Sequence, residues 1–193
     1  MADAVVLSKS GILLDMGCGG NKIAPHWLGM DKRRLPGVDL VHDLEVFPYP
    51  LADESVLTTF CSHVMEHIKP WLTIDVMNEV WRITKPGGKF VINVPYANSP
   101  GYWQDPTHCN EFIAETFIYF DPYPMMLGWN EEKQIQGEPN VWFATYLPKP
   151  WKIIHTTYDF NANLEVVLVK RADILREAPA ELPKREEPNH GKL

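Results

Sequence analysis

Apolar residues occur along this chain in short runs that are separated by turns rich in glycine, proline and aspartate. Short apolar runs bounded by such residues are typical of buried strands. Five runs predict strands at residues 11–16, 27–31, 38–43, 56–62 and 89–94. Two later runs, 152–160 and 164–171, flank an Asn-Ala-Asn turn and predict a β-hairpin.

One amphipathic helix is predicted over residues 70–84, where apolar side chains recur at helical spacing. The segment 85–88 (KPGG) follows and ends the helix, because proline and glycine are expected terminators. Strands that alternate with glycine-rich turns and a helix indicate an α/β fold with a parallel sheet.

Composition narrows the class of protein further. The chain has 193 residues, of which 45% are hydrophobic and 22% are charged, and these values suit one soluble globular domain. We place that domain at residues 1–172 and a flexible charged tail at 173–193. The formal charge of −7 argues against a nucleic-acid partner. Three cysteines without a CxxC pair, no long apolar run and no leader-like N-terminus predict a cytoplasmic protein without a membrane span.

The segment 13–22 (LLDMGCGGNK) carries the strongest chemical signal. Gly17 and Gly19 allow a tight turn and a close approach of the backbone to a ligand. Asp15 beneath this turn would repel a phosphate, whereas it would accept hydrogen bonds from an ammonium group. Asp31 and Asp43 end other predicted strands, at the sheet edge where ligands of parallel sheets bind.

This segment resembles motif I of class I S-adenosylmethionine (SAM)-dependent methyltransferases, which often reads LDxGCGxG. Further segments resemble later motifs of the small, type 11-like members in the expected order: 29–31 (GMD), 43–44 (DL), 60–68 (FCSHVMEHI) and 82–90 (RITKPGGKF). The resemblance implies that Asp31 holds the ribose hydroxyls and that the pair at 43–44 meets the adenine. The implied cofactor-binding residues are Asp15, Gly17, Cys18, Gly19, Asp31, Lys32, Asp43, Leu44, Ser62 and His63.

The resemblance also implies a Rossmann-like sheet of seven strands, mostly parallel, with an antiparallel last strand. Parallel strands usually need crossovers of about a dozen residues or more. The connections at 17–26 and 32–37 are shorter, so we expect some helices of this fold to be shortened or missing. The apolar sheet face left bare would then be covered by an insert or by a second subunit in a homodimer.

The insert at residues 96–151 holds more than half of the aromatic residues of the chain. Aromatic surface of this density is either buried or binds a ligand. Its segments 103–108 (WQDPTH) and 112–120 resemble a block found in some small methyltransferases. The resemblance implies a lid and substrate wall over the cofactor, and the alternative is a structural cover for the sheet.

Methyl transfer from a sulfonium is a direct displacement, in which the protein mainly aligns the reacting atoms. A hydroxyl nucleophile also needs a general base, and histidine titrates near neutrality. We therefore expect His108 and His63 to be catalytic. Tyr96, Trp103 and Asp105 are expected to line the substrate site.

Three alternatives remain open. A dinucleotide-dependent oxidoreductase would carry GxGxxG and an acidic residue about 20 positions later, a spacing that Gly17, Gly19 and Asp31 do not match. The segment 63–67 (HVMEH) matches the HxxEH ligand pattern of zinc hydrolases, through His63, Glu66 and His67, but it lacks an evident third ligand. A SAM-binding or degenerate domain that serves interaction is the third alternative.

The sequence therefore predicts a SAM-dependent methyltransferase that modifies an oxygen or nitrogen of a small or medium-sized acceptor. SAM is the expected cofactor, a small molecule is the expected partner, and no metal is expected.

Overall fold

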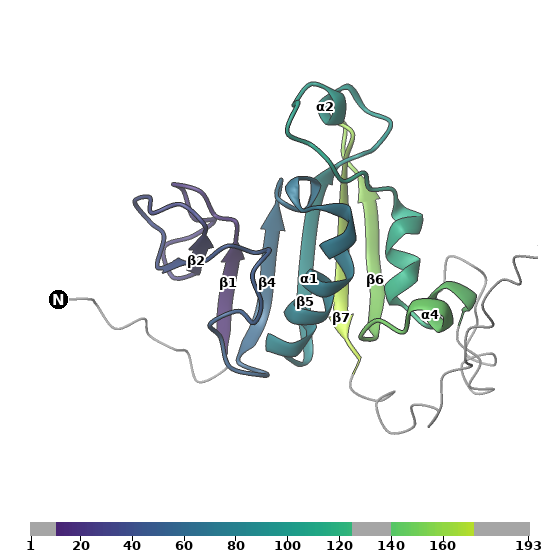
Figure 1. Cartoon of the computed structure of the whole chain (residues 1–193), viewed down its shortest axis with the longest axis horizontal. Helices are drawn as coiled ribbons and strands as arrows, with labels where there is room; N and C mark the ends of the chain where they lie inside the picture. Colours follow the sequence, from purple (N-terminus) through teal and green to yellow (C-terminus); the bar gives the residue numbers. More distant parts are fainter. Residues whose placement is uncertain (1–10, 125–139, 172–193) are drawn as a thin grey trace, which may run out of the picture.

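The computed structural model describes residues 11–124 and 140–171, which build one seven-stranded sheet (Figure 1). The strands are β1 (Ile12–Met16), β2 (Leu28–Asp31), β3 (Leu40–Val41), β4 (Val56–Ser62), β5 (Thr84–Pro95), β6 (Trp151–Tyr158) and β7 (Asn163–Lys170). Their order across the sheet is β3-β2-β1-β4-β5-β7-β6. The predicted tail at 173–193 lies outside the described residues.

The first five strands run parallel, and β7 is antiparallel to both of its neighbours, β5 and β6. This arrangement confirms the predicted Rossmann-like sheet with its terminal hairpin. The hairpin turn is closed by Asp159, whose Oδ1 accepts hydrogen bonds from the backbone N–H groups of Asn161 and Asn163 at 2.8 and 2.9 Å.

Two strand boundaries differ from the prediction. The third strand is shorter than predicted, because only Leu40 and Val41 pair with β2. The fifth strand begins earlier, at Thr84, but its pairing with β4 jumps from Thr84 to Lys89. The KPGG segment therefore bulges out of the ladder, and Gly87 there has a φ of 73°. The sequence correctly marked an interruption but placed it before the strand.

The helices are few and short. They are η1 (Met65–His67), η2 (Pro70–Leu72), α1 (Thr73–Ile83), α2 (Pro100–Trp103), η3 (Ala114–Phe120) and α4 (Val141–Tyr146). No helix joins β1 to β2 or β2 to β3, both connections lying wholly within the described chain, which confirms the expected loss of helices. None of the described helices is long and apolar enough to cross a membrane.

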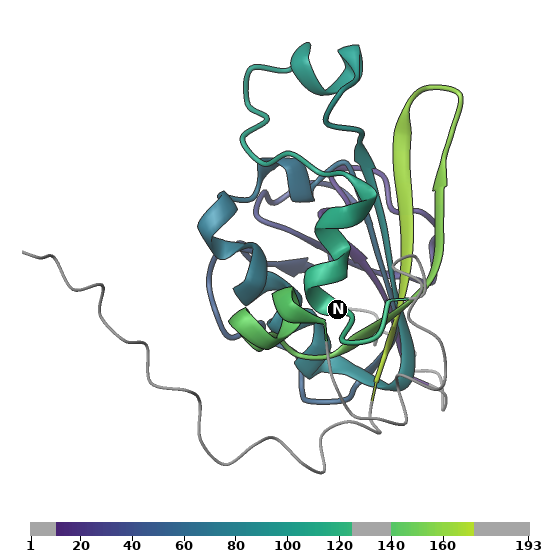
Figure 2. The same ribbon diagram turned by 90° about the vertical axis from the view of Figure 1, so that its right-hand side faces the viewer.

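The second half of the insert covers one face of the sheet. Figure 2 shows α1, η3 and α4 on the same side, and η3 packs against β6 and α4. Phe112, Phe117 and Phe120 are buried there with the core residues of β5 and β7. The end of η3 is fixed by Asp121, whose buried carboxylate accepts a hydrogen bond from Ile153 N at 2.9 Å and pairs with Arg171 at 3.3 Å.

The first half of the insert has a different position. Figure 1 shows α2 beyond the carboxyl ends of the strands, away from the sheet faces. The two parts of the insert therefore lie in different places: α2 lies beyond the strand ends, and residues 112–120 cover the sheet, while the lid over the cofactor stays a prediction. Residues 125–139 of the insert lie outside the described chain.

The opposite face of the sheet carries loops instead of helices in the described ranges. Phe60, Val91 and Val167 form a paired row there and are half-buried. Trp27, in the loop after β1, packs edge-on against Phe60 with 6.4 Å between ring centroids. The expected second subunit on this face stays a prediction.

The two halves of the insert predict different effects on stability. Phe117 is 1% exposed in the core, whereas Trp103 is 68% exposed on α2. Phe117→Ala should lower the free energy of unfolding by about 3–5 kcal/mol through the cavity it leaves. Trp103→Ala should change it by less than about 0.5 kcal/mol. Urea unfolding followed by circular dichroism measures both, and equal losses would contradict the division of the insert.

Candidate functional site

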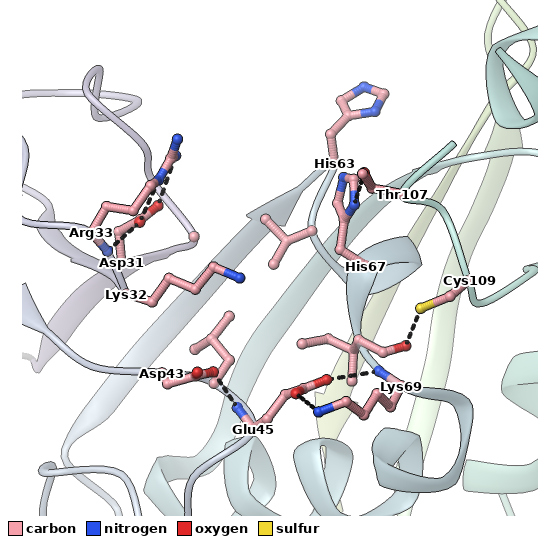
Figure 3. A pocket seen from close by; sticks show the side chains of 14 residues that line it. Asp31, Lys32, Arg33, Asp43, Glu45, His63, His67, Lys69, Thr107 and Cys109 are labelled. Atoms are coloured by element: carbon pink, nitrogen blue, oxygen red, sulfur yellow. Dashed lines mark hydrogen bonds and ion pairs between the residues drawn. The ribbon is translucent and has the colours of Figure 1, made fainter. Parts of the chain in front are cut away.

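A cavity of about 680 Å³ lies at the carboxyl ends of β1, β2 and β4 (Figure 3). Its position is the one at which open parallel sheets bind ligands. The lining residues are Gly17, Asp31, Lys32, Arg33, Asp43, Leu44, Glu45, His63, Val64, His67, Ile68, Lys69, Thr107 and Cys109.

Gly17 forms the floor of this cavity, where β1 ends. Its φ is 76°, and a Cβ at this position would lie 2.3 Å from Val64 Cγ2. The backbone N–H groups of Gly17 and Cys18 donate to the Met30 carbonyl at 2.7 and 3.2 Å, which ties the loop to β2. Only glycine allows this turn and this close contact together.

Asp15 supports the same loop from below. Its Oδ2 accepts a hydrogen bond from Ile23 N at 2.7 Å, and the residue is buried. Burial raises the pKa of the Asp15 carboxyl, although the Ile23 hydrogen bond and the charge of Lys22 partly offset this effect. Asp15 is not among the residues that line the cavity.

Asp31, at the end of β2, is buried in the wall of the cavity. Oδ1 accepts from Arg33 N at 2.8 Å and Arg33 Nε at 3.1 Å, and Oδ2 accepts from Gly19 N at 2.9 Å. Burial disfavours the charged carboxylate, but these hydrogen bonds outweigh it and lower the pKa of Asp31. The side chain is therefore a fixed negative charge facing the cavity.

The loop between β1 and β2 is also held by charge. Asp39 Oδ2 accepts from Lys22 Nζ and from Gly29 N, both at 2.8 Å. Cys18 lies in this loop, and its burial, with the charges of Asp15 and Asp31, raises its thiol pKa to about 11. The thiol is thus protonated at neutral pH.

The other side of the cavity is built by Glu45 and Lys69. Glu45 Oε1 accepts from Lys69 N at 2.9 Å, and its Oε2 pairs with Lys69 Nζ at 2.5 Å. Asp43 Oδ1 accepts from Glu45 N at 3.0 Å, which turns the chain after β3. The dashed contacts of Figure 3 show this group facing Lys32 across the cavity.

A second cavity, of about 380 Å³, adjoins the first. His63 and His67 line both cavities, so they form the partition between them. The remaining lining residues are Glu66, Pro95, Gly101, Gln104, Asp105, His108, Asn161 and Asn163.

Glu66 is the centre of a polar cluster at this partition. His63 Nδ1 lies 3.3 Å from Glu66 Oε1, and His108 Nε2 lies 3.9 Å from the same oxygen. Contact with the Glu66 carboxylate raises the pKa of His63, whose backbone has a φ of 55°. The rings of His67 and His108 meet edge-on with centroids 4.8 Å apart.

The insert is pinned to this cluster by its backbone. The N–H groups of Cys109 and Asn110 donate to the Glu66 carbonyl at 2.9 and 3.1 Å. Thr107 Oγ1 donates to Asp105 Oδ1 at 2.7 Å and lies 3.1 Å from His67 Nδ1. These contacts bring the DPTH segment against η1.

The structure distributes the expected site residues over three places. Gly17, Asp31, Lys32, Asp43, Leu44 and His63 line the first cavity, and Asp105, His63 and His108 line the second. Asp15, Cys18, Gly19 and Ser62 lie in the adjoining strands and loop, outside both linings. Tyr96 stacks edge-on with Tyr158, and Trp103 is exposed, so neither lines these cavities.

Sequence reasoning missed several cavity residues, namely Arg33, Glu45, Lys69, Thr107 and Cys109. The HxxEH pattern was noticed, but its geometry differs from a zinc-peptidase helix. His63 follows β4, whereas Glu66 and His67 lie on the 3₁₀ turn η1, so the motif does not form one helical face. The residue that joins Glu66 and His67 is His108.

The comparisons with known proteins agree with this architecture. Residues 23–92 match the family model described as a methyltransferase domain. None of the curated proteins matches the chain in sequence.

Solved structures share the fold at low sequence identity. A SAM-dependent methyltransferase from Archaeoglobus fulgidus is 16% identical, with a TM-score of 0.52 over 85% of this chain and 88% of that one. The 1,6-didemethyltoxoflavin-N1-methyltransferase of Burkholderia thailandensis, solved with its acceptor and S-adenosylhomocysteine, is 12% identical, with a TM-score of 0.54 over 83% and 71%.

A third similar structure is a putative methyltransferase of Haloferax volcanii in complex with a methyltransferase activator. It is 15% identical, with a TM-score of 0.52 over 84% of this chain and 83% of that chain. Residues 23–92 thus resemble a methyltransferase domain, and the similar structures show that this chain shares the fold of SAM-dependent methyltransferases.

Proposed function

We propose that this protein is an active SAM-dependent methyltransferase that modifies an oxygen or nitrogen of a small or medium-sized acceptor. The observation that carries the proposal is the cavity at the strand ends, where Gly17, Asp31 and Asp43 meet in one lining. Its volume of about 680 Å³ is within the range of small-molecule sites. The similar structures named above include SAM-dependent enzymes.

The residues of the cavity fit the chemical groups of SAM. A carboxylate offers about four lone-pair sites, and Asp31 uses three in close hydrogen bonds. The fourth donor, Arg33 Nη2, is 3.5 Å from Oδ2, and a ribose hydroxyl could replace this long contact. The Asp43 carboxylate lies in the same lining and can accept a hydrogen bond from a further polar group of SAM. Gly17 lets the backbone approach the ligand, and Asp15 supports its loop.

Bound SAM supplies an electrophilic methyl group on a sulfonium. The second cavity is the proposed acceptor site, because it adjoins the first at His63 and His67. His63 and His108 are the proposed catalytic residues, since both line this cavity beside the proposed position of the acceptor's reacting atom. Asp105 is the proposed acceptor-binding carboxylate.

A second candidate is a SAM-binding module without turnover. The observation that favours it is the lack of helices between β1 and β3 in the described chain, where loops alone connect the strands. Calorimetric binding of SAM without methylation in a broad acceptor screen would support this candidate, and methylation of any acceptor excludes it.

Two glycines of one loop give a matched test of SAM binding. Gly17→Ala puts a methyl group 2.3 Å from Val64 Cγ2 at a φ of 76°, whereas a Cβ on Gly20 has no neighbour within 4 Å. Gly17→Ala should weaken SAM binding by about tenfold or more, which corresponds to about 1.4 kcal/mol. Gly20→Ala should leave the Kd within about twofold. Isothermal titration calorimetry measures both, and equal affinities would contradict the assigned floor of the cavity.

A second prediction concerns the Asp31 carboxylate in the cavity wall. Asp31→Ala should weaken SAM binding by about 10–100-fold, because hydrogen bonds to charged groups contribute about 1.5–3 kcal/mol. Asp53→Ala is the control, since Asp53 pairs with Arg82 on the surface outside both cavity linings. If both variants bind SAM as the unmodified chain does, the assignment of Asp31 fails.

A further inference from the structure

The Glu66 carboxylate is fully buried, yet neither of its oxygens accepts a hydrogen bond from the described residues. His63 Nδ1 lies 3.3 Å away but outside hydrogen-bond geometry. The contact with His63 leaves Oε2 unpaired, and natural proteins pair buried carboxylates or use them to bind metals. We propose that Glu66, His67 and His108 bind one divalent transition-metal ion.

The ligand atoms are already gathered. One atom from each of the three side chains lies within 4.8 Å of the others. Ligands around a tetrahedral ion bonded at about 2.1 Å lie about 3.4 Å apart, so the bound ion would draw the group inward. His67 is exposed and has the freedom to move, while Glu66 is fixed in the interior.

The hydrogen bonds of His108 prepare it as a ligand. Its Nδ1 lies 2.7 Å from the Tyr102 carbonyl, which only accepts, so Nδ1 carries the proton. The unprotonated nitrogen is then Nε2, which lies 3.9 Å from Glu66 Oε1. Histidine ligands of metals usually donate their other N–H to a carbonyl or carboxylate in this way.

The tautomer of His67 follows from its hydrogen bonds in the same way. Thr107 gives its hydroxyl proton to Asp105 Oδ1 at 2.7 Å, so its oxygen accepts from His67 Nδ1 at 3.1 Å. His67 Nε2 therefore keeps its lone pair for a ligand bond. A carboxylate thus orients this second imidazole through a hydroxyl group, and the DPTH segment positions a proposed ligand.

The ligand set selects the ion. Two imidazoles and one carboxylate suit Zn²⁺ and similar first-row ions, and the set matches the three protein ligands of catalytic zinc sites that keep a position open. Mg²⁺ prefers oxygen ligands and retains its waters. We therefore expect Zn²⁺ to bind far more tightly than Mg²⁺.

The position of the site indicates its use, and this step rests on the function proposed above. His67 lines both cavities, and Glu66 and His108 line the second, so an ion held by these three side chains would lie beside the proposed acceptor site. An ion held there would lower the pKa of an alcohol or phenol bound through its oxygen, so that the hydroxyl proton could pass to solvent. The inferred acceptor class is thus an oxygen nucleophile that binds metal.

Zinc binding is measured on the full chain without SAM. The protein is stripped with a chelator, and Zn²⁺ is titrated by calorimetry. We expect one equivalent to bind and, at about 100 times its Kd, to raise Tm by about 5 °C or more. Glu66→Gln and His108→Ala should each weaken binding by at least about 100-fold, since even the outer partners of metal ligands are worth about 10–100-fold.

Two control variants should bind zinc as the unmodified chain does. His155→Ala removes an exposed histidine that lies 3.9 Å from Glu165 on the hairpin, and His26→Ala removes an exposed histidine outside both cavity linings. Loss of binding in either control, with binding kept in Glu66→Gln, would overturn the proposed site.

The proposed metal site and the proposed function can be tested independently of each other. SAM binding is measured in excess chelator, and zinc binding is measured without SAM. SAM binding without zinc binding overturns the metal site and leaves the methyltransferase proposal standing. Equal affinities for Zn²⁺ and Mg²⁺, or zinc binding that Glu66→Gln does not weaken, would also overturn the metal site.

Discussion

The parallel pairing of β1 with β2 and β4 is the constraint on which the site depends, because it brings three strand ends to one edge of the sheet. The glycine turn after β1 touches the chain that follows β4, where Gly17 meets Val64 without space for a methyl group. Asp31 is held at the end of β2 by the backbone of the same turn. The cavity thus exists because the strands are in register and Gly17 has no side chain.

The described part of the fold forms this edge of the sheet with few helices. Helices cover one side of the sheet, and the late insert supplies part of that cover through η3 and its buried phenylalanines. The early part of the insert is bound instead to the carbonyl of Glu66, by the N–H groups of Cys109 and Asn110. One connection therefore both completes the core and lines the second cavity.

Sequence patterns predicted the strands well, because apolar runs and glycine turns are local signals. They also placed Asp31, Asp43 and His63 at strand ends, and all three line the cavity. Contacts between distant segments had no such signal. Glu45 and Lys69 meet across 24 positions, and Thr107 reaches His67 across 40. The HxxEH pattern also grouped His67 with His63. In the structure, the ring of His67 contacts His108 of the insert instead.

A structure of the complex with S-adenosylhomocysteine tests the account most directly. The account predicts the ligand in the cavity at the strand ends, with its ribose hydroxyls within hydrogen-bond distance of Asp31 and its sulfur facing the partition at His63 and His67. Density for the ligand at another place on the protein, or a cavity that stays empty at saturating ligand, would contradict it.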